Sequence, residues 1–397
     1  MPRSVPATLL IVALVLILQP AGAMNQTGPA DYYMAYDLSF SINVINDGSS
    51  TIDLAASTLT SPTMFLFFNN TSQTVRLTSS SHKVVIASDS ERNPIGLFQV
   101  DRHLGPGQGI LIQADFRAFT MLTPMRRFEW TPELEYHSSG LMREIPRELI
   151  AQYCVPAGPW KINDAADSWR SVRELAFKLA GNETNVLKTV VRMIDWLGQN
   201  VKYPTTKRDR ILLPDETLAA LEGDCDEQSN LIISLCRIVG IPAYLQCGCT
   251  YLPSKVEKRT RYDGRVSFEL DRLGWHAWAM VYIPPWGWLP VDMTMGYSKE
   301  DALRAIQTAA PQALSTLISN NYFTKDYVSE ANHDAEQLKR MNVRIEQRDI
   351  MKPIEISSEY QASGHAWITT LILICLGVVV LSAYVAARAK RRRELRT

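Results

Sequence analysis

The sequence has few cysteines, no net charge and no internal repeats or low-complexity tracts. Lys and Arg total 41, and so do Asp and Glu, so no excess of positive charge indicates a nucleic acid partner. No Asp- or Asn-rich loop has the ligand spacing of a calcium site. Apolar residues make up 46% of the 397 residues, which is typical of a folded globular protein with a buried core.

The cysteine spacing disfavours a structural zinc site, because it lacks the paired short intervals that such sites use. One of the six lies in a long apolar stretch near the C-terminus, which leaves an odd number elsewhere. If one of the five is a free functional thiol, the other four can form up to two disulfides, whose pairing stays open. The six are Cys154, Cys225, Cys236, Cys247, Cys249 and Cys375.

The zero net charge hides an asymmetry between the two ends and the body of the chain. The basic tail and Arg3 together leave the remainder at about −6. Residues 1–23 have a short positive start, an apolar stretch and a small-residue end, which predicts a cleaved signal peptide; an uncleaved anchor remains the alternative. Residues 366–387 are uncharged and long enough to span a bilayer, and residues 388–397 form the basic run that stays cytoplasmic.

These segments predict a single-pass protein of the cell membrane, with an extracytoplasmic body and a cytoplasmic C-terminus.

Short strands dominate the first part of the body. Asn46-Asp47-Gly48 predicts a hairpin there, and the set of short strands predicts a β-sandwich. Prolines then mark a junction. The predicted order is a signal peptide (1–23), a β-sandwich-like domain (24–125), a junction (126–165), a second domain (166–345), a juxtamembrane segment (346–365), a transmembrane helix (366–387) and a basic tail (388–397).

The second domain mixes helices and strands. Helical spacing extends over 168–202 and again on either side of Gly223, and residues 299–341 also read as helical. Two strands, from about Trp275 to Ile283 and from Trp288 to Asp292, read as a hairpin, whereas the charged run 255–265 reads as a solvated loop.

The segment EGDCDEQSNL places Cys225 where a helix is expected to begin. The unpaired N–H groups of a helix start stabilise a thiolate and an oxyanion. Asp224 and Asp226 oppose a thiolate, although Asp226 also suits the first helical turn. A packing role, a disulfide, a metal ligand and a nucleophile remain the alternatives for this cysteine at this point.

A nucleophilic cysteine needs a base, and the base needs a group that orients it. His276 and Asp292 lie on the two strands of the predicted hairpin, so antiparallel pairing brings them together. Each has a simpler interpretation: His276 as a half-buried histidine between tryptophans, and Asp292 as a cap of the next segment.

The runs GDCDEQSNLIISLCRIVGIPA and WHAWAMVYIPPWGWLPVDMT together resemble the transglutaminase-like superfamily, particularly its archaeal and bacterial members. The resemblance implies Cys225 as nucleophile, His276 as general base and acid, and Asp292 as the group that orients His276. It also implies an α+β fold with a papain-like core, in which a Cys-bearing helix packs on an antiparallel sheet.

The same resemblance implies acyl chemistry on a protein or peptide amide through a Cys thioester, with water or an amine as acceptor. The mechanism needs no cofactor or metal. The alternative is a catalytically silent transglutaminase-like scaffold for protein interaction at the cell envelope.

Overall fold

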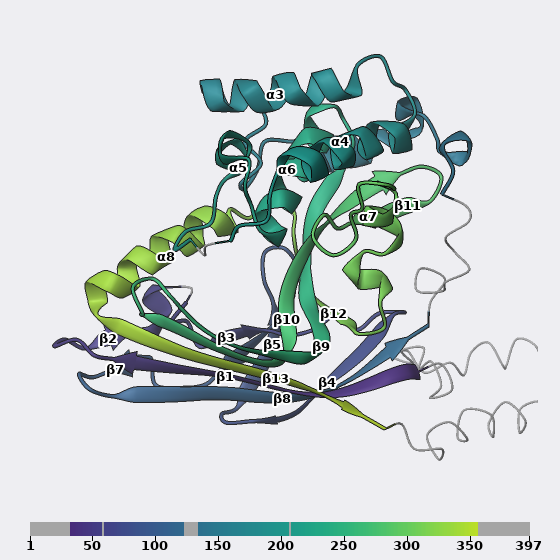
Figure 1. The fold of residues 1–397 in the computed structure, drawn as a ribbon. Helices are drawn as coiled ribbons and strands as arrows, with labels where there is room; N and C mark the ends of the chain where they lie inside the picture. Colours follow the sequence, from purple (N-terminus) through teal and green to yellow (C-terminus); the bar gives the residue numbers. More distant parts are fainter. Residues whose placement is uncertain (1–31, 58, 123–133, 206–207, 356–397) are drawn as a thin grey trace, which may run out of the picture. The chain divides into compact units, whose positions relative to one another are not determined.

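A computed structural model describes residues 32–57, 59–122, 134–205 and 208–355 of the chain (Figure 1). The predicted signal peptide and the predicted transmembrane helix therefore lie outside the described residues. Among the residues that are described, no helix is long and apolar enough to cross a membrane.

One large mixed sheet of eight strands organises the fold. Its strands follow the order β12-β9-β10-β13-β1-β8-β4, and β11 pairs with β10 beside this path. Strand β10 is antiparallel to β9 and β11 but parallel to β13. The strands are β1 (Tyr32–Asn46), β4 (Gln73–Ser80), β8 (Gly109–Met121), β9 (Ala243–Arg261), β10 (Val266–Ile283), β11 (Gly287–Val291), β12 (Thr316–Tyr322) and β13 (Val343–Ile354).

The expected separate N-terminal β-sandwich is not what the structure contains. Strand β1 pairs along its length with β13 from the other end of the described chain, from Ala35 opposite Ile354 to Asn46 opposite Val343. The buried side chains of β1 pack with Leu273 of β10 in one apolar cluster. Strands distant in sequence thus bury a shared face, which sequence alternation alone does not reveal.

The predicted hairpin at Asn46-Asp47-Gly48 is also not formed. The Asn46 side-chain amide donates to the carbonyls of Ser50 and Leu104, each at 2.8 Å, and directs the chain away from β1. The next strand, β2 (Ile52–Asp53), pairs instead with β7 (His103–Leu104). A small third sheet contains β3 (Thr63–Phe65), β5 (Val84–Ser88) and β6 (Pro94–Phe98).

Helices α3, α4, α5 and α6 gather at the upper end of β9 and β10 in Figure 1, whereas α8 lies apart from them and contacts β13. Helix α6 packs on β10. Its apolar side chains share a buried cluster with side chains of α3, α4, β9 and β10. The predicted helices over 168–202 are confirmed as α3 and α4, interrupted at Gly181. The helices are α2 (Arg147–Tyr153), α3 (Asp167–Ala180), α4 (Val186–Asn200), α5 (Pro214–Ala220), α6 (Cys225–Ile238), α7 (Arg304–Gln307) and α8 (Tyr327–Met341).

Two sequence predictions in this part are wrong. Residues 299–341 are not one helical region, because the edge strand β12 lies between α7 and α8 and pairs with β9. Residues 255–261 are not a loop, because β9 continues through them opposite β10, with Arg261 paired to Val266. In both segments, pairing with a neighbouring strand overrides local composition.

Asp349 of β13 is a buried acid beneath Trp275, with 1% of its surface exposed. It accepts hydrogen bonds from Trp275 Nε1 at 2.7 Å and Gln347 Nε2 at 2.6 Å. Burial raises the pKa of Asp349 to about 6, against an ordinary value of 3.8, although the two hydrogen bonds oppose the shift. Its carboxyl group therefore holds a proton in the folded chain at a pH where the unfolded chain has lost it.

We expect the free energy of unfolding to fall as the pH rises between about 4 and 6, because only the folded state retains the Asp349 proton there. The full contribution is about 3 kcal/mol at most. Asp349→Asn should remove this slope while keeping an acceptor for Trp275. Urea unfolding at both ends of the range measures the effect, with Asp37→Asn as the exposed control; equal slopes in all three proteins would contradict it.

Candidate active site

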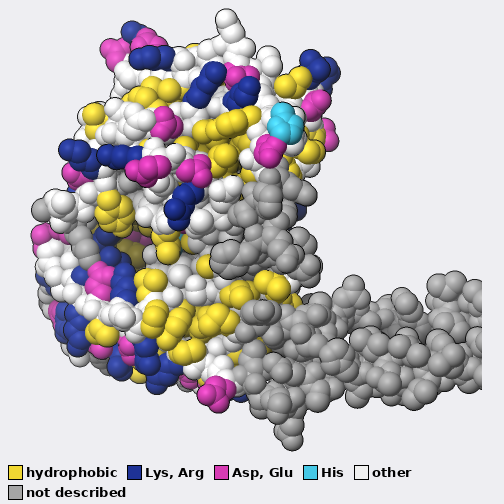
Figure 2. All heavy atoms as spheres, turned by 45° about the vertical axis from the view of Figure 1, so that its right-hand side comes forward, with side chains coloured by type: hydrophobic (Ala, Val, Ile, Leu, Met, Phe, Trp, Pro, Cys, Tyr) yellow, Lys and Arg dark blue, Asp and Glu magenta, His cyan; other side chains and the backbone are white. Residues whose placement is uncertain are grey.

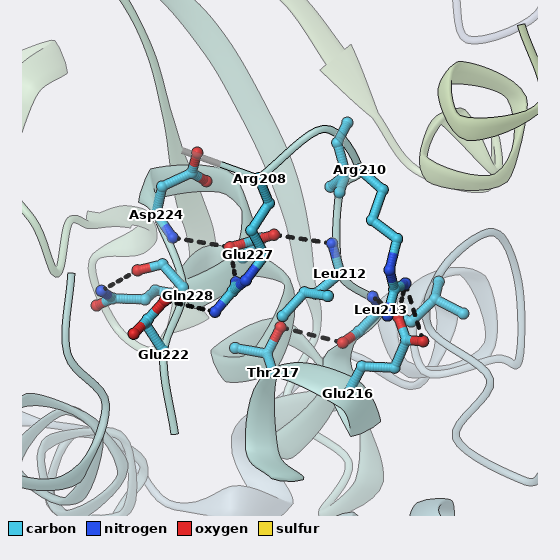
Figure 3. Close-up of polar contacts among 12 residues, drawn as sticks. Arg208, Arg210, Leu212, Leu213, Glu216, Thr217, Glu222, Asp224, Glu227 and Gln228 are labelled. Carbon is cyan, nitrogen blue, oxygen red and sulfur yellow. Dashed lines mark hydrogen bonds and ion pairs between the residues drawn. The ribbon is translucent and has the colours of Figure 1, made fainter. Parts of the chain in front are cut away.

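Cys225 is the first residue of α6, and a network of polar contacts fixes the turn before it (Figure 3). The backbone N–H of Asp224 donates to Glu227 Oε2 at 2.9 Å, and Gln228 Nε2 donates to the Gly223 carbonyl at 2.7 Å. A Cβ atom at Gly223 would lie 2.9 Å from the Glu227 Cβ, so the close approach requires glycine. The predicted helix start at Cys225 is confirmed, and local sequence accounts for it.

The Cys225 thiol contacts β10 at the backbone N–H of Ala277, the residue that follows His276. The Ser229 hydroxyl contacts both the Cys225 carbonyl, at 2.6 Å, and the Ala277 carbonyl, at 3.4 Å, and so ties the helix to the strand. Burial, followed by the charges of Asp226 and Asp224, raises the pKa of Cys225 well above its usual value. A hydrogen bond from the Ala277 backbone N–H acts in the opposite direction but does not outweigh them. The resting thiol is therefore protonated at neutral pH.

His276 and Asp292 are in direct contact. His276 Nε2 lies 2.8 Å from Asp292 Oδ2, and the side chains are 9% and 1% exposed. The hairpin register explains the contact: Ala279 pairs with Val291, which places Asp292 level with Trp278 and diagonal to His276. The contact leaves Nδ1 as the free nitrogen of the imidazole.

Several backbone donors hold the Asp292 carboxylate. Its Oδ1 accepts from the N–H groups of Thr294 and Met295, each at 3.1 Å, and its Oδ2 accepts from the N–H of Ala310 at 3.0 Å. Burial alone would raise the pKa of Asp292, but the hydrogen bond to His276 and these donors outweigh it, so the pKa lies below its usual value. Asp292 is therefore a fixed, ionised acceptor at neutral pH.

The structure thus brings His276 and Asp292 together and places Cys225 against the residue that follows His276. Among the hydrogen bonds of the described residues, none joins Cys225 to His276 directly. Catalytic contacts of this kind often become short only when substrate is bound.

The acids beside Cys225 form a close, half-buried pair. The ligand atoms of Asp224, Cys225 and Asp226 lie within 4.8 Å of one another, which makes them the one group in the described ranges close enough to share a metal ion. Burial and the charge of Asp224 raise the pKa of Asp226 well above its usual value. A proton shared by the two carboxyl groups offsets their repulsion, and the Tyr327 hydroxyl donates to Asp226 at 3.2 Å.

The sequence did not predict which residues form the second wall of this site. A cavity of about 150 Å³ adjoins Asp224 and Asp226 and is lined by Tyr203, Arg259 and Arg261 as well. The basic run 255–265 was the available signal, and its position before the histidine strand indicated an edge of the cleft. Strand pairing of β9 is what directs two of its arginines into the cavity wall.

The other cysteines of the described chain form no disulfide. Cys154, Cys236, Cys247 and Cys249 are free thiols, as is Cys225. Cys236 and Cys249 are buried, which suits packing residues.

Part of the chain is similar to known proteins. Residues 173–293 match the family profile of the transglutaminase-like superfamily. The chain is 29% identical over 133 residues to YebA of Bacillus subtilis (strain 168), an uncharacterized protein; the match covers 32% of this chain and 18% of YebA. The predicted resemblance is thus confirmed: the chain carries a domain of the transglutaminase-like superfamily.

Two solved structures are also similar to the chain. One is a candidate cysteine protease from Cytophaga hutchinsonii, with a TM-score of 0.47 and 14% identity, covering 82% of this chain and 92% of that one. The other is the periplasmic domain of TgpA from Pseudomonas aeruginosa, bound to ethylmercury, with a TM-score of 0.29 and 14% identity, covering 69% and 94%.

Proposed function

We propose that this protein is a cysteine hydrolase or acyltransferase that acts on amide bonds of proteins or peptides. The observation that carries the proposal is the Asp292–His276 pair beside the start of α6, where Cys225 adjoins the next residue of the histidine strand. A helix start supplies N–H donors for an oxyanion, and a fixed carboxylate orients the imidazole.

In the proposed reaction, Cys225 Sγ attacks the substrate carbonyl carbon while Nδ1 of His276 takes the thiol proton. The carbonyl π electrons move to the oxygen and return as the C–N bond breaks, and His276 gives its proton to the departing amine. Water or a second amine then attacks the thioester and releases Cys225. Because the resting thiol is protonated, His276 must accept the proton during the attack rather than before it.

The raised pKa of Cys225 is the observation that favours a silent scaffold instead. Incubation with a peptide mixture, with and without an added primary amine, tests the two functions. The enzyme is expected to give a Cys225 acyl adduct in the intact mass, and free acid or amine-linked products according to the acceptor. Absence of both adduct and product across the mixture would favour the scaffold.

We also propose that the body of the protein is exported and held at the membrane by one helix. The proposal rests on the sequences of residues 1–23 and 366–387. Protease added to intact cells should then degrade the body, whereas a body protected until lysis would overturn this localisation.

A further inference from the structure

The cavity beside Cys225 has a cationic wall and an acidic wall, and no ion pair of the described residues crosses it from Arg259 or Arg261 to Asp224 or Asp226. Its basic residues are Arg208, Arg210, Arg259 and Arg261, and its acidic residues are Asp224, Asp226 and Glu227. Basic and acidic side chains also lie interspersed over the upper part of the face drawn in Figure 2. The question is which of these charges a ligand could meet.

Arg208, Arg210 and Glu227 already have polar partners within the protein (Figure 3). Arg208 pairs with Glu222 at 2.5 Å and with Glu227 at 3.6 Å, and Arg210 makes two hydrogen bonds to Glu216, at 2.8 and 3.0 Å. Glu227 also accepts from the Leu212 N–H at 2.8 Å. These groups build the wall and are not free to bind a ligand.

The remaining charges face the cavity without pairing with each other. No ion pair of the described residues joins Arg259 or Arg261 to Asp224 or Asp226. Arg259 pairs instead with Glu257, at 3.5 Å, and its guanidinium lies 5.0 Å from the centre of the Phe268 ring. The Nε–H groups of both arginines are buried and have no hydrogen-bond partner, and neither has Oδ1 of Asp224. Buried groups in this state cost about 1–3 kcal/mol each.

Tyr203 lines the same cavity as Asp224, Asp226 and Arg259. The carboxylate oxygens of Asp224 and Asp226 lie within 4.8 Å of the Cys225 sulfur, so the cavity adjoins the thiol.

We propose that this cavity is a subsite for a zwitterionic group, with an ammonium toward Asp224 and Asp226 and a carboxylate toward Arg259 and Arg261. The inference rests on the proposed function and narrows its substrate class: the substrate or the acyl acceptor carries an amino-acid head with both charges free. An ammonium held here would lie next to Cys225. Once it has given one proton to the carboxyl pair, the neutral amine can attack the thioester carbon; the C–S bond breaks, and the amine's second proton passes through His276 to the Cys225 sulfur.

L-Alanine, ethylamine and propionate supply the probes, because they carry both charges, the cation alone or the anion alone. The readout is the rate at which iodoacetamide alkylates Cys225 in the full chain, followed by mass spectrometry of the Cys225 peptide, with and without each probe. L-Alanine is expected to slow alkylation at much lower concentration than either single-charge probe. Equal protection by all three, or none, would overturn the proposal.

Variants separate the two walls. Arg261→Gln and Asp226→Asn should each raise the half-protecting L-alanine concentration by about tenfold. Comparing rates with and without probe within each variant removes any change in thiol reactivity. Arg117→Gln and Asp37→Asn, from an exposed ion pair on β8 and β1, are the matched controls and should behave as the parent. Wild-type protection in both cavity variants would contradict the subsite.

The alkylation rate of Cys225 can be measured whether or not the protein catalyses a reaction, so the subsite and the proposed function are tested separately. A protein that forms the Cys225 acyl adduct but shows no L-alanine protection would refute the subsite and keep the proposed function. Protection without any adduct or product would keep the subsite and refute the enzyme.

Discussion

Cys225→Ala is expected to lower the rate of amide cleavage or transfer by at least about a thousandfold. The variant removes the sulfur that forms the thioester while leaving the capping contacts of Asp224, Glu227 and Gln228 in place. The helix start should therefore keep its geometry, and the thermal midpoint should change little. Product formation under saturating peptide, together with the loss of the acyl adduct, measures the effect.

Cys236→Ala is the control for this variant, because it removes a buried thiol from the same helix. It should destabilise the fold modestly by leaving a small cavity, yet retain activity. A Cys225→Ala protein with undiminished activity would show that another group carries the reaction.

Asp292→Asn is expected to lower kcat by roughly a hundredfold to ten-thousandfold. The asparagine can still accept from the Thr294 and Met295 N–H groups, but it loses the charge that orients His276 and stabilises its protonated form. The loss should fall mainly on kcat rather than KM, because Asp292 positions the base and contacts no substrate. Initial rates across a range of peptide concentrations separate the two constants.

A merely structural role for Asp292 would lower the thermal midpoint and reduce activity only through unfolded protein. Asp334→Asn provides the comparison, since Asp334 is a buried acid of α8 whose carboxylate accepts from the Leu59 N–H. It should keep kcat even where stability drops. Equal kcat losses in both variants, in step with their stability, would contradict the positioning role.

The helix start at Cys225 was predictable because its determinants are local. Gly223 permits the close turn, Glu227 caps the helix, and all of these residues lie within one short segment. The His276–Asp292 contact was nearly as easy to predict from the sequence, because a tight hairpin brings the two strands together. The roles of the three residues remain predictions for the experiments above.

The N-terminal architecture was not predictable in the same way. The alternation in β1 indicates a strand with one buried face, but nothing in it indicates that β13, about three hundred residues later, is its partner. The edge strand β12 was missed for a similar reason: Leu317 and Ile318 suit either a helix or a strand until β9 pairs with them.

The helix that begins at Cys225, the hairpin that holds His276 and the superfamily of their domain can thus be read from the amino-acid order. The pairing of the N-terminal strands with the large sheet, and the position of Arg259 and Arg261 in the cavity that Asp224 and Asp226 also line, become visible only in the folded chain. The difference lies in the range of the interactions. Caps and tight turns are set by neighbours in sequence, whereas strand partners and opposing cavity walls depend on long-range burial of apolar faces.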